Sequence, residues 1–184
     1  MKKVVIGIAA VLVILVVLFV SGYNGIVKAQ TQVEEQNANI MAQLQRRIDL
    51  IPNLIQTVNN FTTHETEVFA AVSEAREAMM SADTMPEMAA ANDEMSAALT
   101  SLVAVAEAYP ELKSDAVYIS LMDELAGTEN RIAVARQDYN AAVQSYNLSI
   151  RRFPGVLFAK LFGFSESQYF EATDAAQTTV PSVS

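Results

Sequence analysis

Apolar residues form one unbroken run near the start of the chain. Residues Val4 to Val20 follow two lysines and contain nothing more polar than Gly7. A helix rises about 1.5 Å per residue, so this run, extended through Tyr23, reaches about the 30 Å thickness of a bilayer's hydrocarbon core. Its apolar side chains together contribute about −5 kcal/mol to insertion. The sequence therefore predicts a transmembrane anchor over residues 1–23 that contacts lipid through Val4 to Val20.

A cleaved signal peptide is the alternative, because it shares the basic start and the apolar stretch. Secretory apolar regions are usually about 7–15 residues long and end at a small-residue cleavage site. Here the run is longer, and Phe19-Val20-Ser21-Gly22 is a poor cleavage site. Tyr23 also suits the boundary between lipid and water. We therefore expect the anchor to be retained.

Beyond Gly25 apolar residues recur every three or four positions, which is the spacing of amphipathic helices. The first stripe keeps its register across Pro52 and predicts one long, kinked helix that reaches about Met80. Its core positions are Ile40, Leu44, Ile48, Ile51, Ile55, Val58 and Phe61.

A second helix is predicted to begin near residue 85. Asp83 or Thr84 can cap it, Pro86 suits its first turn, and Glu87 adds a favourable charge there. Its apolar positions end before Pro110, which disfavours helix at the preceding residue. They are Met88, Met95, Leu99, Leu102, Val103 and Ala106.

The longest stripe runs for about 55 Å and ends at Phe153-Pro154-Gly155. A short apolar segment, Phe153 to Phe164, follows with Lys160 as its only charge; it is too short to span a membrane and hard to solvate. It must dock on the bundle, on another protomer or on the lipid interface. The members of the long stripe are Tyr118, Leu121, Leu125, Thr128, Ile132, Ala135, Tyr139, Val143, Tyr146 and Ile150.

Helices joined by short turns pack as antiparallel neighbours. We therefore predict an all-α protein with an N-terminal transmembrane helix over residues 1–23. An elongated antiparallel bundle of three long helices plus a short C-terminal helix is expected over 24–165. Residues 166–184 are expected to form a flexible tail, because their composition buries little apolar surface.

Composition excludes several classes of chemistry. A net charge of −9 lacks the basic footprint of nucleic-acid binding, and the absence of cysteine removes disulfides, thiolate metal sites and cysteine nucleophiles. His64 is the only histidine, and Val68 stands where a zinc protease motif needs its second one. No glycine-rich phosphate loop or serine hydrolase motif is found. We expect no catalytic, cofactor-binding or metal-binding residues, no cofactor and no enzymatic activity.

Two groups of side chains invite a structural and a functional interpretation. Charged residues on the first and the longest predicted helices face each other in an antiparallel bundle and are expected to form a polar network that fixes register. Methionines near the second helix either fill the core or form an adaptable binding surface. The charged residues are Arg46, Arg47, Asp49, Glu129, Arg131, Arg136 and Asp138, and the methionines are Met79, Met80, Met85, Met88 and Met95.

Several clusters stand in a characteristic order: Gln45 to Leu54, Glu107 to Lys113, Thr128 to Arg136, the pairs Tyr139-Asn140 and Tyr146-Asn147, and Phe153-Pro154. In order and spacing they resemble the LemA family of bacterial membrane proteins over nearly the whole chain. The resemblance implies a single-pass anchor and an antiparallel helical bundle, without an established activity, substrate or cofactor. Relatives include a protein of the magnetosome membrane, which points to membrane organisation.

Two classes of function follow. One is a structural or interaction protein that organises membrane or scaffolds partners, with self-association through helical faces or through Phe153 to Phe164. The alternative is a membrane-tethered sensor or small-ligand-binding module, which would need a pocket with converging polar groups. Lys2 and Lys3 precede the apolar run and only Lys28 closely follows it, which predicts a cytoplasmic N-terminus and an exported bundle, periplasmic or extracellular. The opposite topology is the alternative.

Overall fold

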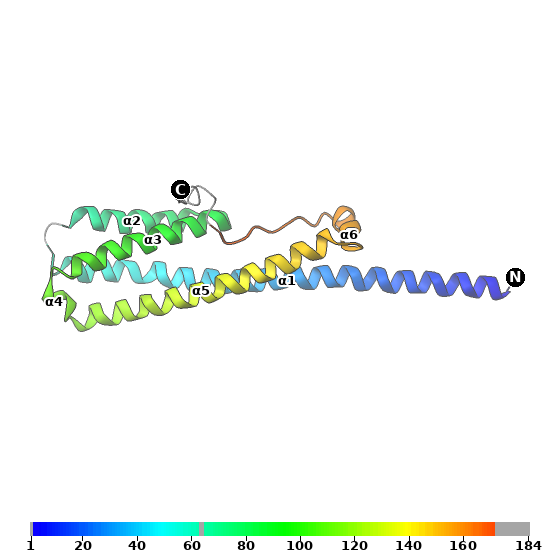
Figure 1. The fold of residues 1–184 in the computed structure, drawn as a ribbon, viewed down its shortest axis with the longest axis horizontal. Helices are drawn as coiled ribbons and strands as arrows, with labels where there is room; N and C mark the ends of the chain where they lie inside the picture. Colours follow the sequence, from blue (N-terminus) through cyan, green and yellow to red (C-terminus); the bar gives the residue numbers. More distant parts are fainter. Residues whose placement is uncertain (1, 63–64, 172–184) are drawn as a thin grey trace, which may run out of the picture. The chain divides into compact units, whose positions relative to one another are not determined.

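A computed structural model describes residues 2–62 and 65–171. Over these residues the protein is all-α, as predicted, with long helices and a short C-terminal one (Figure 1). The predicted features of His64 lie outside the described residues. The helices are α1 (Lys2–Asn59), α2 (Thr66–Ser81), α3 (Met85–Ala106), α4 (Pro110–Lys113), α5 (Ala116–Arg151) and α6 (Gly155–Phe162).

The chain divides into two compact units. The first unit comprises Met1–Asn37 and Tyr139–Ser167, and the second comprises Ala38–Asp138 and Gln168–Ser184. Helices α1 and α5 contribute residues to both units. The predicted boundary between anchor and bundle at residue 23 is not a break in secondary structure, because α1 continues through it.

The second unit is a helical bundle with an apolar interior. Helices α2 and α3 lie beside the later part of α1 and the earlier part of α5 (Figure 1). Most members of the predicted stripes supply this interior. Leu54, which was not predicted, is fully buried. Four predicted members are only half-buried: Ile55, Phe61, Val103 and Leu121. Fully buried members include Ile40, Leu44, Ile51, Val58, Met95, Leu102 and Thr128.

The first bundle helix ends earlier than the sequence predicts. Pro52 does lie inside α1, but the helix stops at Asn59 and α2 begins only at Thr66. The last turn tightens, with the Phe61 amide donating to the Val58 carbonyl at 3.0 Å. The Thr62 hydroxyl donates to the same carbonyl. Asn and Thr favour such local hydrogen bonds over helix continuation, which explains the break.

Thr84 is the residue that caps α3. The Glu87 amide donates to its hydroxyl at 3.3 Å, and the Glu87 carboxylate accepts from the Thr84 amide at 3.0 Å, which forms a capping box. The Asp83 amide donates to the same carboxylate at 3.1 Å. Both predicted candidates thus take part, but only Thr84 caps with its side chain.

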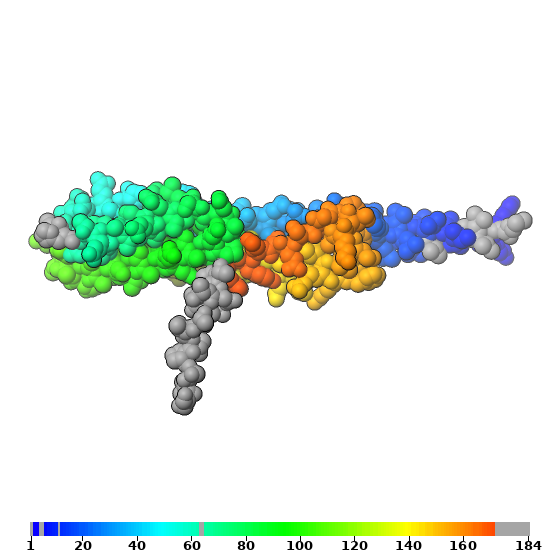
Figure 2. Space-filling view, turned by 90° about the horizontal axis from the view of Figure 1, so that it is seen from above, coloured from blue at the N-terminus to red at the C-terminus, as the bar shows by residue number. Residues whose placement is uncertain are grey.

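The first unit contains an exposed apolar stretch of α1. Its described large apolar side chains from Ile6 to Val20 are 45% to 68% exposed, and Figure 2 shows the blue segment uncovered except at its inner end, beside the orange α6. Among the residues that the structure describes, α1 is the single helix long and apolar enough to cross a membrane.

Part of the predicted flexible tail is fixed in place. The Ser167 amide donates to the Asn147 side-chain oxygen at 2.9 Å, and the Asn147 amide group donates to the Ser167 carbonyl at 2.9 Å. Phe170 is 1% exposed. An aromatic side chain and a paired backbone therefore hold residues 166–171, contrary to the prediction, and residues 172–184 lie outside the described part.

Candidate functional site

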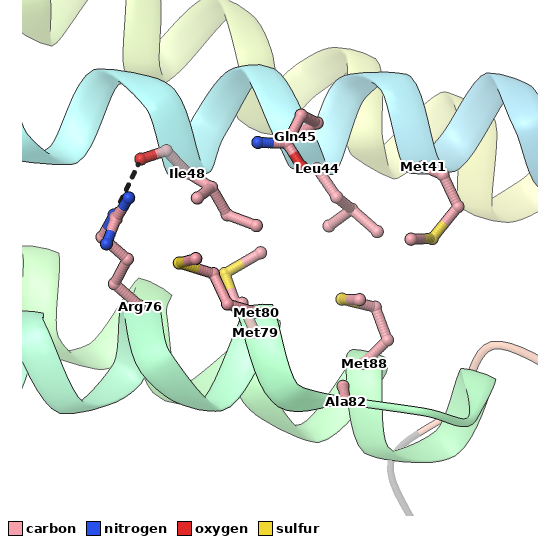
Figure 3. Close-up of a pocket in the computed structure, with 9 residues that line it drawn as sticks. All are labelled: Met41, Leu44, Gln45, Ile48, Arg76, Met79, Met80, Ala82 and Met88. Atoms are coloured by element: carbon pink, nitrogen blue, oxygen red, sulfur yellow. Dashed lines mark hydrogen bonds between the residues drawn. The ribbon is translucent and has the colours of Figure 1, made fainter.

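A small methionine-lined pocket lies in the second unit between α1, α2 and the start of α3 (Figure 3). Its volume is about 220 Å³. Side chains of α1 enter it from one side and methionines from the others, as Figure 3 shows. The lining residues are Met41, Leu44, Gln45, Ile48, Arg76, Met79, Met80, Ala82 and Met88.

The pocket is lined mainly by apolar and thioether side chains rather than by reactive groups. Its lining holds no carboxylate, hydroxyl or imidazole, and its one charged group, Arg76, donates from Nε to the Ile48 carbonyl at 3.3 Å. Small-molecule sites usually have volumes of roughly 300–1,000 Å³ and several converging polar groups. This pocket therefore suits an apolar side chain better than a polar metabolite.

Some of the predicted methionines fill the core, and one lies on an exposed surface. Met79, Met88 and Met95 are at most 5% exposed and fill the core. Met80 is 60% exposed, and Met41, which the sequence analysis did not single out, is 38% exposed. Met41 lies on α1, far in sequence from the other four, so only the packing of α1 against α2 reveals it as part of this surface.

Arg47 forms the central polar cluster of the second unit. It is 3% exposed, and its Nη1 lies 2.7 Å from Asn92 Oδ1 and 2.6 Å from Glu129 Oε2, while Nη2 lies 3.1 Å from Ser96 Oγ. Burial lowers the pKa of the Arg47 guanidinium, and the Glu129 carboxylate opposes that shift. The predicted pairing of the first and longest helices is thus confirmed at Arg47 and Glu129.

The remaining predicted charges are less connected. Arg46 pairs with Glu124 of α5, both partly exposed, and Asp49 accepts from Gln45 one turn earlier in α1 at 2.8 Å. Arg136 and Asp138 are exposed. Asn92 and Ser96 were missed because their role appears only once α3 packs against α1. Within the cluster the Ser96 hydroxyl donates to the Asn92 carbonyl at 3.0 Å, one turn earlier in α3.

A second hollow in this unit lies between α1 and α5. Its volume is about 360 Å³, and it is shallow. Amides of Asn39, Gln43 and Asn130 line it together with Arg131. These side chains can bind solvent or a polar surface, but none is an acid or base that would support catalysis.

In the first unit α6 packs closely against α1. The Phe158 ring meets Phe19 edge-on with centroids 4.9 Å apart, and a Cβ at Gly22 would come within 2.6 Å of Phe158. Phe162 meets Tyr23 at 4.8 Å. Figure 2 shows α6, in orange, against the blue helix. One side of the Phe153 to Phe164 segment therefore packs on residues of α1 that were predicted to belong to the anchor, a site that the three predicted alternatives did not name.

Two features fix α6 in this place. A Cβ at Gly155 would meet the Ser149 carbonyl oxygen at 1.9 Å, so only glycine allows the close return of the chain past the end of α5. Beyond α6, the Tyr146 hydroxyl donates to the Ser165 carbonyl at 2.9 Å. A glycine directly after Phe153-Pro154 was the available sequence signal for this return.

These observations define a helical-bundle protein with one helix able to cross a membrane. Residues 36–184 match the LemA family, and the chain belongs to that family. The match covers the bundle and begins after the exposed apolar stretch of α1.

Similar proteins carry two kinds of name. The chain is 27% identical to magnetosome protein MamQ 2 of Paramagnetospirillum magneticum, over 86% of this chain and 68% of the relative. It is 25% identical to magnetosome protein MamQ of Magnetospirillum gryphiswaldense, with the same coverage. It is 22% identical to protein LemA of Metamycoplasma hominis, over 89% of this chain and 75% of the relative.

Proposed function

We propose that the protein is a membrane-anchored helical scaffold that holds interaction partners close to a bilayer and has no catalytic activity. The observation that carries this proposal is the continuity of α1. One helix exposes an apolar stretch from Ile6 to Val20 and, further along, supplies Ile40 and Leu44 to the bundle interior. The proposed anchor and one helix of the bundle are thus the same continuous helix, α1.

The bundle offers interaction surfaces rather than a reaction centre. Met41 and Met80 are exposed at the edge of the methionine-lined pocket, and flexible thioether side chains suit adaptable protein contacts. The polar cluster around Arg47 joins α1, α3 and α5 through hydrogen bonds and an ion pair. The names of the MamQ relatives, which refer to magnetosomes, are consistent with a role at a membrane.

Membrane extraction tests the anchoring. Val13→Arg combined with Leu15→Arg places two charges in the exposed stretch, each unfavourable by about 2.5–3.5 kcal/mol at the centre of a bilayer. We expect the native protein to stay in membranes washed with alkaline carbonate and the double variant to be released.

The matched control is Val117→Arg with Val134→Arg, which adds the same charge at exposed positions of the bundle. This control should remain in the membrane. Release of the native protein by carbonate, with the double variant unchanged, would contradict the anchored scaffold.

A small-ligand-binding module is the second candidate, and the methionine-lined pocket favours it. A ligand there would be small and apolar, because the pocket holds about 220 Å³ and one polar edge at Arg76. Met88→Trp should fill the pocket and abolish saturable binding of an apolar fluorescent probe. Equal probe binding by the native protein and this variant would remove the second candidate.

A further inference from the structure

We propose that α6 is a lipid-contacting element: its outer apolar side enters the headgroup region of the bilayer beside the point where α1 leaves the hydrocarbon core. This inference rests on the proposed anchoring of α1 and adds a second membrane contact, far from the first in sequence. The occupant of the α6 surface is thereby a lipid surface, preferably one with anionic headgroups.

Helix α6 lies beside the end of the apolar run of α1. Phe158 packs on Phe19 and Gly22, and Phe162 packs on Tyr23. These positions span about 6 Å of helix at the end of the apolar run. The headgroup regions add about 5–8 Å on each side of the hydrocarbon core. If α1 crosses the bilayer, α6 therefore lies at the headgroup level.

Several large apolar side chains in and beside α6 point away from α1. Phe158 faces α1 and is 5% exposed, but Phe153, Leu157 and Leu161 are 81%, 57% and 67% exposed. Leu157 and Leu161 are four residues apart within α6 and lie on one side of it, and Phe153 lies just before the helix begins. Phe162 adds 47% exposure beside them. This surface continues the exposed apolar surface of α1 at Phe19 and Val20, so one lipid phase can cover both.

Exposed basic residues lie near α6. Beyond the apolar run the first unit carries four basic and three acidic residues, whereas the second unit carries six basic and eighteen acidic ones. Arg151, Arg152 and Lys160 lie at or near α6 and are exposed. Arg151 forms an ion pair with Glu166, with Nε 3.4 Å from Oε1. The charges of Arg152 and Lys160 are therefore the ones directed to solvent or headgroups. Basic residues near a membrane surface are attracted to anionic lipids.

The chain contains no tryptophan, so a single introduced indole reports its own surroundings. The full-length Leu161→Trp variant is reconstituted in vesicles of phosphatidylcholine with phosphatidylglycerol whose acyl chains are brominated close to the headgroup. Val13→Trp, in the apolar run of α1, is the positive control. Val117→Trp, exposed in the second unit, is the negative control.

We expect the Leu161→Trp emission to shift to shorter wavelength and to be quenched by the shallow bromines more strongly than that of Val13→Trp, which lies near the middle of the apolar run. Bromines placed at the ends of the acyl chains should quench Val13→Trp but not Leu161→Trp. Val117→Trp should keep its aqueous emission in both preparations. Replacing phosphatidylglycerol by phosphatidylcholine should weaken the quenching of Leu161→Trp and leave that of Val13→Trp unchanged.

The two proposals fail in different ways. If Val13→Trp is not quenched by the bromines at the ends of the acyl chains, the anchored scaffold itself is wrong. If Val13→Trp is quenched but Leu161→Trp keeps an aqueous spectrum, α6 faces water and the lipid contact is wrong. A shifted Leu161→Trp emission without quenching means that protein covers α6, and a second copy of this chain, detectable by cross-linking, then replaces lipid as its occupant.

Discussion

The Arg47 side chain carries a permanent charge at an almost fully buried site. Its guanidinium binds Asn92, Ser96 and Glu129, yet the lowered pKa of Arg47 indicates that burial disfavours the charge more than Glu129 compensates. Replacing a whole buried ion-pair network by apolar side chains is often neutral or stabilising, whereas removing one partner alone leaves the others unpaired. The cluster therefore fixes how α1, α3 and α5 fit together more than it stabilises the bundle.

This interpretation predicts different outcomes for two substitutions of Arg47. Arg47→Met leaves the buried Asn92 oxygen without its partner and should lower the free energy of unfolding by about 1–3 kcal/mol. Arg47→Ala should fall below the methionine variant by about a further 2–5 kcal/mol, because it leaves a cavity. Arg46→Met, at a partly exposed site, should change stability by less than about 0.5 kcal/mol. Urea titration measures all three. A larger loss in Arg47→Met would mean that the charge network contributes net stability.

Ile132 tests the long stripe itself. The side chain is 2% exposed in the middle of α5, so Ile132→Ala should lower the free energy of unfolding by about 2–5 kcal/mol through lost burial and an unfilled cavity. Val134→Ala, two residues later and 59% exposed, is the matched control and should change it by less than about 0.5 kcal/mol. Thermal or urea unfolding followed by circular dichroism compares them. Equal effects would show that the core is misplaced.

Residue patterns allowed the core to be predicted but not its polar partners. Helical spacing alone places Leu44, Ile51 and Ile132 inside, because a bundle helix can bury only one side. Nothing in the sequence around Asn92 marks it as a partner of Arg47, since the two meet only through packing of separate helices. For the same reason Met41 was not recognised as part of the methionine surface.

At the scale of elements, the capping box of α3 depends on pH. The Glu87 carboxylate accepts backbone hydrogen bonds from Asp83 and Thr84, and these bonds lower the pKa of Glu87. A lowered folded-state pKa means that the ionised box stabilises the fold above the unfolded pKa of about 4.3. That stabilisation is lost as the pH falls through the folded-state pKa.

We therefore expect the native protein to be more stable than Glu87→Gln at neutral pH, and the difference to shrink on acidification below about pH 4.3. Thr84→Ala removes the capping hydroxyl and should lower stability by about 1 kcal/mol. Most of that loss should persist in acid, because the hydroxyl does not titrate. Unfolding curves at several pH values test both, and a difference that grows on acidification would contradict the box.

Helix starts were easier to predict than helix ends. Thr84, Pro86 and Glu87 carry a strong start signal, whereas the end of α1 at Asn59 depends on weak preferences of Asn and Thr that an apolar stripe masked. The placement of α6 was open among three sites. Its contacts with Phe19 and Tyr23 could not be predicted, because they join segments more than a hundred residues apart in sequence.

At the scale of the whole molecule, charge separates between the two units. The first unit has an excess of basic residues, while the second carries eighteen acidic and six basic ones. A strongly acidic bundle is repelled by anionic headgroups, and a basic first unit is attracted to them. The charge distribution thus supports a membrane contact confined to the first unit.

The orientation of the anchor remains our prediction from the basic residues beside the apolar run. Lys2 and Lys3 precede it and only Lys28 follows closely, so we expect the bundle to be exported. Because the native chain has no cysteine, Val117→Cys provides a single exposed thiol in the bundle. A membrane-impermeant maleimide should label it in intact spheroplasts, whereas a cysteine inserted after Lys3 should react only after permeabilisation.

Substitution of the two lysines tests the cause of this orientation. Lys2→Gln with Lys3→Gln removes the basic excess while leaving the apolar run unchanged, so part of the Val117→Cys population should become accessible only after permeabilisation. Lys113→Gln, far from the span in sequence, should leave labelling unchanged. If Val117→Cys reacts only in permeabilised cells from the outset, the bundle is cytoplasmic, and its acidic helices meet cytoplasmic partners instead.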